Sequence, residues 1–141
     1  MASGIYTSFK LFTGQAAIDL TSSPSGHAIN CILMDSSHAF TATNQYYADV
    51  SAHELPTAGG YTTGGVALTN RTWSGSGTTI VWDSDDASWT SATFTAYHCV
   101  LADWTHASKA IVASFDFGGA QTVSAGTFTV QWNSSGILRQ T

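Results

Sequence analysis

The sequence predicts an all-β protein, and three observations support this class. Only 9% of the 141 residues are charged, whereas long soluble helices normally carry many Glu, Lys and Arg side chains. The chain is rich in Thr, Val and aromatic residues, which favour strands. Its 13 glycines supply turns between short apolar runs. We therefore expect one mainly β domain over residues 1–141, a β-sandwich or jelly roll, with a possible helix or arm at residues 1–14.

The first segment of the chain has the apolar spacing of a short helix. In "SGIYTSFKLFTGQ", Phe9 and Phe12 follow Ile5 by four and seven positions, which places the three side chains on one helical face. Gly14 is suited to end such a helix. Two roles are open for this segment. It can cover one end of the core, or it can be an arm that docks on a neighbouring molecule.

The next segments predict a buried strand followed by a long connection. The stretch "HAINCILMD" is nearly continuous apolar, as expected of a strand that is buried on both faces. Beyond it, "NQYYADVSAHEL" can form one helical turn, and "PTAGGYTTGG" can only be a loop. A loop of this length in a compact domain is usually functional or packed against something.

The second half of the chain reads as a series of strands. "GVALTNRTWS" and "TTIVWDSDD" are two strands joined by the turn "SGSG". "SATFTAYHCVLAD", "KAIVASFDF" and "GTFTVQW" alternate between two sets of side chains. Gly118-Gly119 predicts a two-residue hairpin after the second of these. At least six strands at this spacing are typical of a sandwich or jelly roll.

Charge and cysteine usage exclude some classes of function. The net charge is −5 and the only cations are Lys10, Arg71, Lys109 and Arg139, so nucleic-acid binding is not expected. No apolar run is long enough to cross a membrane, and the N-terminus does not predict a secretion signal. Cys31 and Cys99 each stand in an apolar run and are expected to be buried free thiols, although spacing alone does not exclude a disulfide.

One stretch combines the three residue types of a hydrolase triad. Asp35, Ser36, Ser37 and His38 are consecutive, but a triad needs its acid and its nucleophile on opposite sides of the imidazole. Neighbours in sequence seldom reach that arrangement, and the chain has no G-x-S-x-G elbow. A polar turn that follows a strand explains the same residues. We therefore expect no catalytic residues and no enzyme activity.

Possible metal sites are also incomplete. His53-Glu54 starts like a zinc motif, but Thr57 stands where the second histidine is required. Asp83, Asp85 and Asp86 lack the glycine and glutamate of a calcium loop. His98, His106 and Asp103 could bind a metal ion, but a histidine in mid-strand is more often a hydrogen-bonded core residue. No metal or cofactor is expected.

Aromatic residues outside the clearest strands predict a contact surface. Tyr and Trp are enriched at protein interfaces. They also stack on sugars, so a carbohydrate-binding module is an alternative. The segment Ala39 to Gly65, together with the N-terminal arm, is expected to supply much of the contact. The candidate interface residues are Ile5, Tyr6, Phe9, Phe12, Phe40, Tyr46, Tyr47, Tyr61 and Trp104.

A set of short motifs resembles one known group of proteins. In order along the chain these motifs are "GIYTSFK", "LMDSSHAF", "YADVSAHEL", "GYTTGGVALTNRT", "DDASWTSATFTAYHCV", "ASFDFGG" and "GTFTVQWNSSGILR". Each motif is weak alone, but together they span nearly the whole chain. The ordered set resembles small virion structural proteins of tailed bacteriophages, in particular capsid decoration or cement proteins.

The resemblance implies a role rather than a reaction. It implies a jelly-roll-like sandwich that binds the outer surface of the shell built by the major capsid protein and stabilises it against internal DNA pressure. The chain would then be assembled in the host bacterial cytoplasm and reside on the capsid exterior. Self-association as a dimer or trimer at a symmetry axis is expected. A tail, connector or head-fibre protein is the alternative within the same group.

Overall fold

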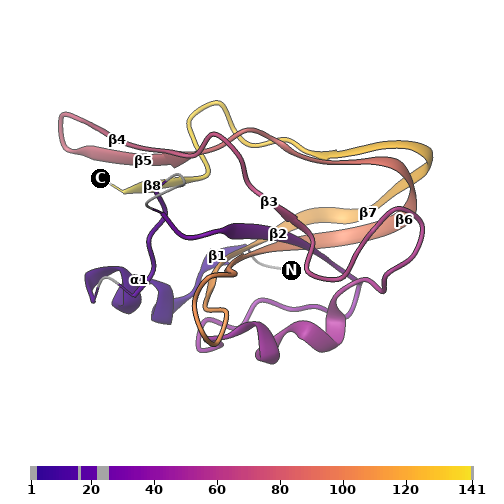
Figure 1. Cartoon of the computed structure of the whole chain (residues 1–141), viewed down its shortest axis with the longest axis horizontal. Helices are drawn as coiled ribbons and strands as arrows, with labels where there is room; N and C mark the ends of the chain where they lie inside the picture. The colour runs from indigo at the N-terminus through magenta and orange to yellow at the C-terminus, as the bar shows by residue number, and fades with distance from the viewer. Residues whose placement is uncertain (1–2, 16, 22–25, 141) are drawn as a thin grey trace.

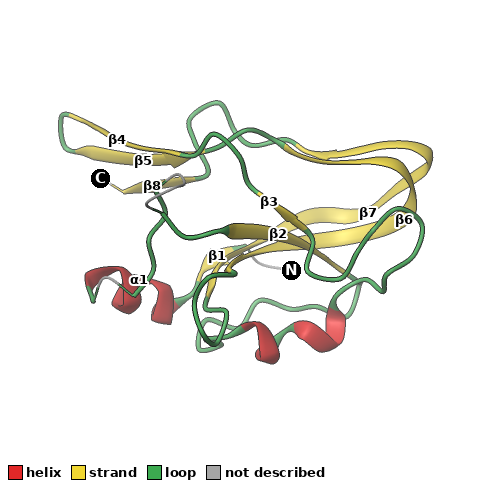
Figure 2. Ribbon diagram, in the orientation of Figure 1, coloured by secondary structure: helices red, strands yellow, loops and turns green. Residues whose placement is uncertain are grey.

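The computed structural model describes residues 3–15, 17–21 and 26–140, and it is mainly β (Figures 1 and 2). Two antiparallel sheets are present in this part of the chain. One has the strand order β1-β7-β6-β2-β3 and the other the order β4-β5-β8, which confirms the predicted sandwich-like class. The strands are β1 (Gly4–Ile5), β2 (Ile29–Met34), β3 (Val66–Ala67), β4 (Thr72–Ser76), β5 (Thr79–Asp83), β6 (Ala87–Asp103), β7 (Ile111–Val130) and β8 (Leu138–Gln140).

The two long strands β6 and β7 run through both layers of the molecule. Figure 1 shows that the β6–β7 pair bends over at one end, so that one half lies beside β1 and β2 and the other half lies above them. The register of the pair shifts at several points, including between Trp89 and Ala92 and between Ala96 and His98. Such irregularities increase local twist and bending. In the core, the rings of Tyr61, Trp89, Phe94 and Phe128 contact one another.

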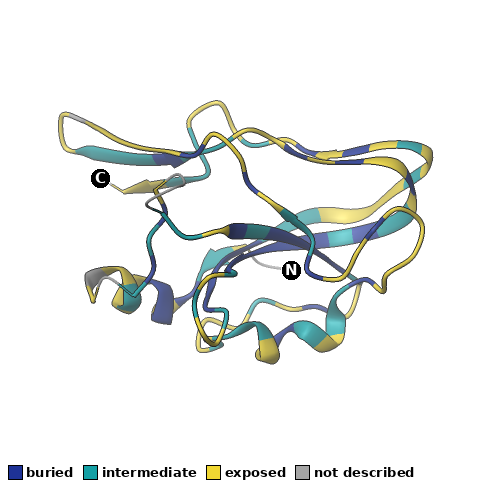
Figure 3. Cartoon of the chain, viewed as in Figure 1, coloured by how far each residue is buried: buried dark blue, intermediate teal, exposed yellow. Residues whose placement is uncertain are grey.

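Strand β2 lies between β6 and β3 in the larger sheet and is buried, as the sequence predicts. It pairs with β6 along its whole length and with β3 through Asn30 and Cys31. Five of its six residues are buried, and Figure 3 shows β2 and the adjoining part of β6 in dark blue. Cys31 and Cys99 are buried free thiols, which confirms that prediction. Burial raises the pKa of the Cys99 thiol, and contact with Cys31 adds to this effect.

The predicted N-terminal helix is present but starts later than Ile5. Helix α1 spans Thr7–Gly14 and ends at the predicted glycine. Ile5 belongs instead to β1, where it pairs with Ala113 of β7. Phe9 is buried and Phe12 packs half-buried against the core. Of the two roles left open by the sequence, the helix in this chain takes the first and covers the core.

The predicted hairpin at Gly118-Gly119 is wrong, because β7 continues through both residues. Ala96 pairs with Gln121 and His98 with Asp116, so a step of two residues along β6 matches a step of five along β7. The three extra residues form a bulge. Gly118 and Gly119 have φ values of 81° and 146°, a conformation that side chains disfavour. The glycine pair therefore indicated a bulge in a continuous strand rather than a reversal of the chain.

The predicted strand "GVALTNRTWS" is divided between the two sheets. Its first part is β3 and its last part belongs to β4, and Asn70 between them has a φ of 50°. The side chain of Asn70 donates a hydrogen bond to Asp85, which fixes this change of direction. The predicted β4–β5 hairpin is confirmed. Its two-residue turn is Gly77-Thr78, because Ser76 already pairs with Thr79.

The segment between β2 and β3 contains two short 3₁₀ helices, Tyr47–Asp49 and Ser51–His53, where a helical turn was predicted. Figure 2 shows them with α1 on one side of the molecule, away from the β4–β5 hairpin. Leu55 donates a backbone hydrogen bond to Leu33, so the segment returns along the edge of β2. Among the described residues, no helix has the length and apolar character that a membrane span requires.

Candidate protein-binding surface

Glu54 anchors the long segment between β2 and β3. Its Oε2 accepts a hydrogen bond from the Tyr47 hydroxyl at 2.5 Å, and its Oε1 accepts bonds from the Tyr61 hydroxyl and the Gly64 amide, both at 2.6 Å. Burial, reinforced by the bond to Glu54, raises the pKa of both tyrosines. The Tyr61 hydroxyl also accepts the Leu33 amide at 3.0 Å. The carboxylate of Glu54 thus ties distant parts of the segment to one another, and the Tyr61 hydroxyl links the segment to β2.

Four of the predicted interface residues form two half-buried pairs of rings. Phe12 stacks on Tyr46 with ring centroids 6.1 Å apart, and His106 lies against both. Tyr47 contacts Trp104 edge-on at 5.0 Å. These rings come from α1, from the segment after β2 and from the β6–β7 connection. The sequence did not show that they contact one another, because they lie far apart along the chain.

Three predicted interface residues are buried in the chain's own core. Tyr6, Phe9 and Tyr61 have exposed fractions of 0%, 6% and 2%. The side chains of Tyr6 and Tyr61 therefore offer almost no surface to a partner in this conformation, whereas the small exposed part of Phe9 lies in the groove described below. Phe40 and Ile5 are half-buried, and the Phe40 ring lies 5.0 Å from that of Tyr6. Aromatic content alone predicted contact, but burial separates core rings from surface rings.

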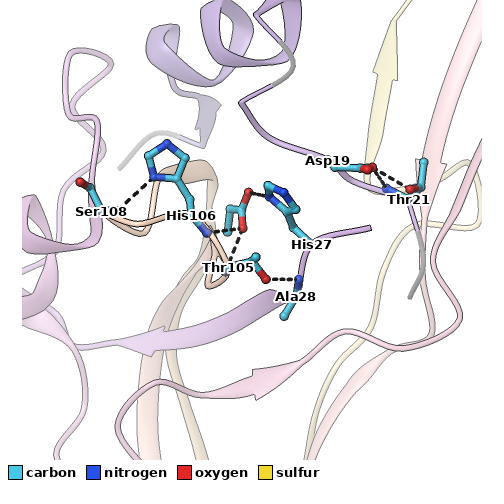
Figure 4. A network of polar contacts seen from close by, with 8 residues as sticks. Asp19, Thr21, His27, Ala28, Thr105, His106 and Ser108 are labelled. Carbon is cyan, nitrogen blue, oxygen red and sulfur yellow. Dashed lines mark hydrogen bonds and ion pairs between the residues drawn. The ribbon is translucent and has the colours of Figure 1, made fainter. Parts of the chain in front are cut away.

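A buried carboxylate positions the β6–β7 connection (Figure 4). Asp103 is fully buried, and its Oδ2 lies 2.5 Å from Nδ1 of His27. Its Oδ1 accepts the backbone amides of Thr105 and His106, each at 3.0 Å. The Thr105 hydroxyl in turn accepts the Ala28 amide. This network fixes the connection that carries Trp104 and His106 to the start of β2.

The histidines considered for metal binding lie apart. His98 donates from Nδ1 to the Asp35 carbonyl and lies 3.7 Å from Asp116, whereas His106 belongs to the turn after Asp103. Within the part of the chain that the structure describes, no group of three or more His, Cys, Asp or Glu side chains is arranged to hold a metal ion.

The stretch from Asp35 to His38 is a polar turn with one buried end. Asp35 Oδ1 accepts the Ser37 amide at 2.7 Å, and the side chains of Ser36 and Ser37 face solvent. The sequence did not reveal that His38 is buried. Its Nε2 lies 2.9 Å from the Ser114 hydroxyl, and both residues are 1% exposed. Through His38, the turn that follows β2 therefore packs against β7.

An apolar groove lies between α1 and the three-stranded sheet, where Figure 1 shows the helix facing β8 and β5. Its volume is about 370 Å³. The helical side contributes Ile5, Phe9 and Lys10, and the sheet contributes Trp73, Ile80, Leu138 and Arg139. Two of the predicted interface residues, Ile5 and Phe9, therefore line this groove.

The sheet side of the groove follows from strand register. Trp73 is opposite Trp82, and Trp82 is opposite Leu138, so these side chains share one face of the sheet. Ile80 stands two residues before Trp82 and joins the same face. Trp82 is fully buried and donates from its indole nitrogen to the Leu20 carbonyl, whereas Trp73 is 47% exposed. The face is thus only partly covered by the chain itself.

The sequence did not reveal this groove. The alternation of Ile80 with Trp82 was a signal for one apolar face, and Trp73 on the preceding strand was a second signal for the same face. Nothing local connected that face to Phe9 or to Leu138.

Comparison of the chain with protein-family models, curated proteins and solved structures found no match in any of the three.

Proposed function

We propose that the chain is a virion structural protein that binds the outer surface of a phage capsid shell and stabilises it. The ordered motifs described above suggest the class. The structural observation that carries the proposal is the open apolar groove between α1 and the sheet, with Trp73 47% exposed beside it. Exposed apolar surface of this kind marks interaction sites. The two half-buried ring pairs, Phe12 with Tyr46 and Tyr47 with Trp104, provide further amphipathic rings.

The proposed action is stabilisation by selective binding. A protein that binds only the assembled shell lowers its free energy relative to the disrupted one. Many identical copies on a symmetric lattice supply avidity, so that each contact can be weak. Only 9% of the residues are charged, and few ions must therefore be desolvated on docking.

Imaging of purified virions by electron cryomicroscopy tests the proposal. We expect density for the sandwich on the shell exterior, in contact with major capsid protein subunits. Density in the tail, connector or a head fibre would replace the proposal with another structural role. Absence of the chain from the particle would contradict both. Light scattering of the purified chain tests the expected dimer or trimer separately.

A carbohydrate-binding module gains no specific support. Such a module requires several coplanar, exposed aromatic side chains on one surface. Within the described residues, Trp73 and Leu11 are the large hydrophobic side chains that are exposed. A single exposed indole provides one stacking platform.

A further inference from the structure

We infer that acid releases the N-terminal segment, residues 3–14, from the rest of the fold, with the buried His38 as the trigger. In the released state β1 and α1 are detached, while β2, β6 and β7 remain paired. Such a release does not depend on the proposed function, so either can fail without the other. Three features lead to it: the place of His38, the groups that face it, and the small number of contacts that hold the segment.

His38 lies in a small buried cluster of polar side chains where distant parts of the chain meet. Its Nε2 lies 2.9 Å from the Ser114 hydroxyl of β7, and its ring meets the His98 ring of β6 edge-on at 5.2 Å. Tyr6, which joins β1 to α1, places its hydroxyl beside the same Ser114. These four residues are between 0% and 2% exposed. A charge on His38 therefore has no water to solvate it while the cluster is closed.

The hydrogen bonding of this cluster is incomplete. Among the residues that the structure describes, the Tyr6 hydroxyl and Nε2 of His98 are buried atoms without a hydrogen-bond partner. A buried polar group in this condition weakens the closed state and gains solvation when the site opens. The cluster is therefore a weak point of the fold even before any proton is added.

The charged and titratable groups around the cluster make His38 the trigger rather than His98. Nε2 of His98 has the Asp116 carboxylate of β7 3.7 Å away, so a proton there gains an acidic neighbour. His38 instead faces two histidines, His98 and His53 of the second 3₁₀ helix, and Asp35 of its own turn opposes them only in part. Burial, helped by both histidines, lowers the pKa of His38 to about 4.

Few contacts hold the N-terminal segment. Strand β1 pairs with β7 at two positions, and α1 is eight residues long without a side-chain cap at its N-terminus. The backbone amides of Tyr6 and Thr7 donate to the carbonyls of Val112 and Ala42. An isolated helix of this length is unstable in water, so α1 depends on its packing. The pairing of β6 with β2 and β7 is far more extensive.

The same segment packs against the turn that carries His38. The Phe40 ring lies 5.0 Å from the Tyr6 ring, and a Cβ on Gly4 would lie 2.6 Å from the Phe40 ring. Detachment of residues 3–14 removes Tyr6 from the cluster and brings water to the imidazole without separating β2 from β6. It also exposes the apolar side chains of Tyr6 and Phe9, which are buried in the closed state.

The pH dependence of the release follows from linkage. His38 has a pKa of about 4 in the closed state and an ordinary value of 6.5 once it is solvated. Below pH 6.5 the open state therefore takes up a proton that the closed state excludes, so closure is fully favoured above this pH and is lost as the pH falls towards 4. Between pH 7.5 and pH 5 the ratio of open to closed molecules should rise about 25-fold.

Native-state hydrogen exchange, followed by NMR on the full chain at both pH values, tests the release. Protection factors remove the direct effect of pH on exchange. We expect the Tyr6 and Thr7 amides to be protected about tenfold less, or weaker still, than the hydrogen-bonded amides of β2 and β6 at either pH. Their protection should fall about 25-fold from pH 7.5 to pH 5. Protection equal to that of β2 and β6 would show that the segment opens only when the whole chain unfolds. Protection that does not change with pH would show that it opens without His38. Either result would overturn the inference.

Matched histidine variants identify the trigger. His38→Gln removes the imidazole from the cluster, and its Tyr6 and Thr7 amides should lose less than about threefold of their protection over the same pH range. His53→Gln makes the same substitution at an imidazole whose side chain is 42% exposed, and it should keep a fall of about tenfold or more. An equal pH response of the two variants would contradict a trigger at His38. If His38→Gln does not fold, the ring of His38 in the wild type decides the point by NMR. It should remain neutral at pH 6, and a ring that is largely protonated there would refute the inference.

Discussion

Acid should destabilise the fold through His38, and the size of the effect follows from its burial. The imidazole is 1% exposed and contacts the Ser114 hydroxyl, with the His98 ring 5.2 Å away and His53 and Asp35 nearby. Burial, helped by the two other histidines, lowers the pKa of His38 from 6.5 to about 4. The neutral form is therefore favoured in the folded state.

The sign of the pH dependence is fixed by this direction. Below pH 6.5 the unfolded chain takes up a proton at His38 that the folded chain refuses, so stability is full above this pH and is lost as the pH falls towards 4. With these two pKa values, the loss between pH 7.5 and pH 5 is about 2 kcal/mol from this residue. Other histidines titrate in the same range, and a variant is needed to isolate the contribution.

Urea unfolding followed by tryptophan fluorescence measures the effect. The variant His38→Gln keeps a polar atom near Ser114 but cannot be protonated. Its free energy of unfolding should fall about 2 kcal/mol less than that of the wild type between pH 7.5 and pH 5. An identical fall in the two proteins would refute the reasoning. If the variant is too unstable, the NMR titration of the His38 ring in the wild type gives the same answer, and an ordinary pKa there would refute it.

Three further tests address the Glu54 hydrogen bonds, the tight backbone at Gly65 and the burial of the two cysteines. Glu54→Ala removes the acceptor of three hydrogen bonds and should cost about 2 kcal/mol of unfolding free energy in urea. Gly65→Ala places a Cβ 1.9 Å from the Cys31 carbonyl oxygen at a φ of 67° and should cost about 3 kcal/mol or more. Gly77→Ala, at a φ of 61° with nothing within 4 Å, is its control and should cost about 1 kcal/mol. Similar losses for the two glycines would contradict the clash. Cys31 and Cys99 should not react with Ellman's reagent until urea unfolds the chain, and rapid reaction of the native protein would contradict their burial.

The local sequence pattern predicted those strands in which each face has the same environment along the length of the strand. The continuous apolar run of β2 reflects a strand covered on both sides, and the alternation before Asp103 reflects β6. Prediction failed where one local signal fits two structures. Gly118-Gly119 permits positive φ in a hairpin and in a bulge alike, and only pairing with a distant strand decides between them.

The candidate site was predicted less well because it is assembled across the chain. Tyr6 and Tyr61 are buried whereas Tyr46 is only half-buried, although all three are tyrosines. The difference depends on which distant parts of the chain cover each ring. The groove joins Phe9 with Leu138, at opposite ends of the sequence. A single sequence contains no signal for such a pair, so the groove could only be found once the sheet order was known.

The shared hairpin of β6 and β7 has a consequence for how the chain folds. Its pairs begin at Ala102 and Ile111, nine residues apart, and extend to Ala87 and Val130, 43 residues apart. Each new pair therefore closes only a small additional loop once its neighbour has formed, and the entropic cost of long-range contact is divided into small steps. Pairing that spreads outwards from the turn at Trp104 forms, in one continuous process, the parts of β6 and β7 that belong to each layer. Relaxation kinetics should accordingly show one main phase in which both halves of the bent β6–β7 pair form together.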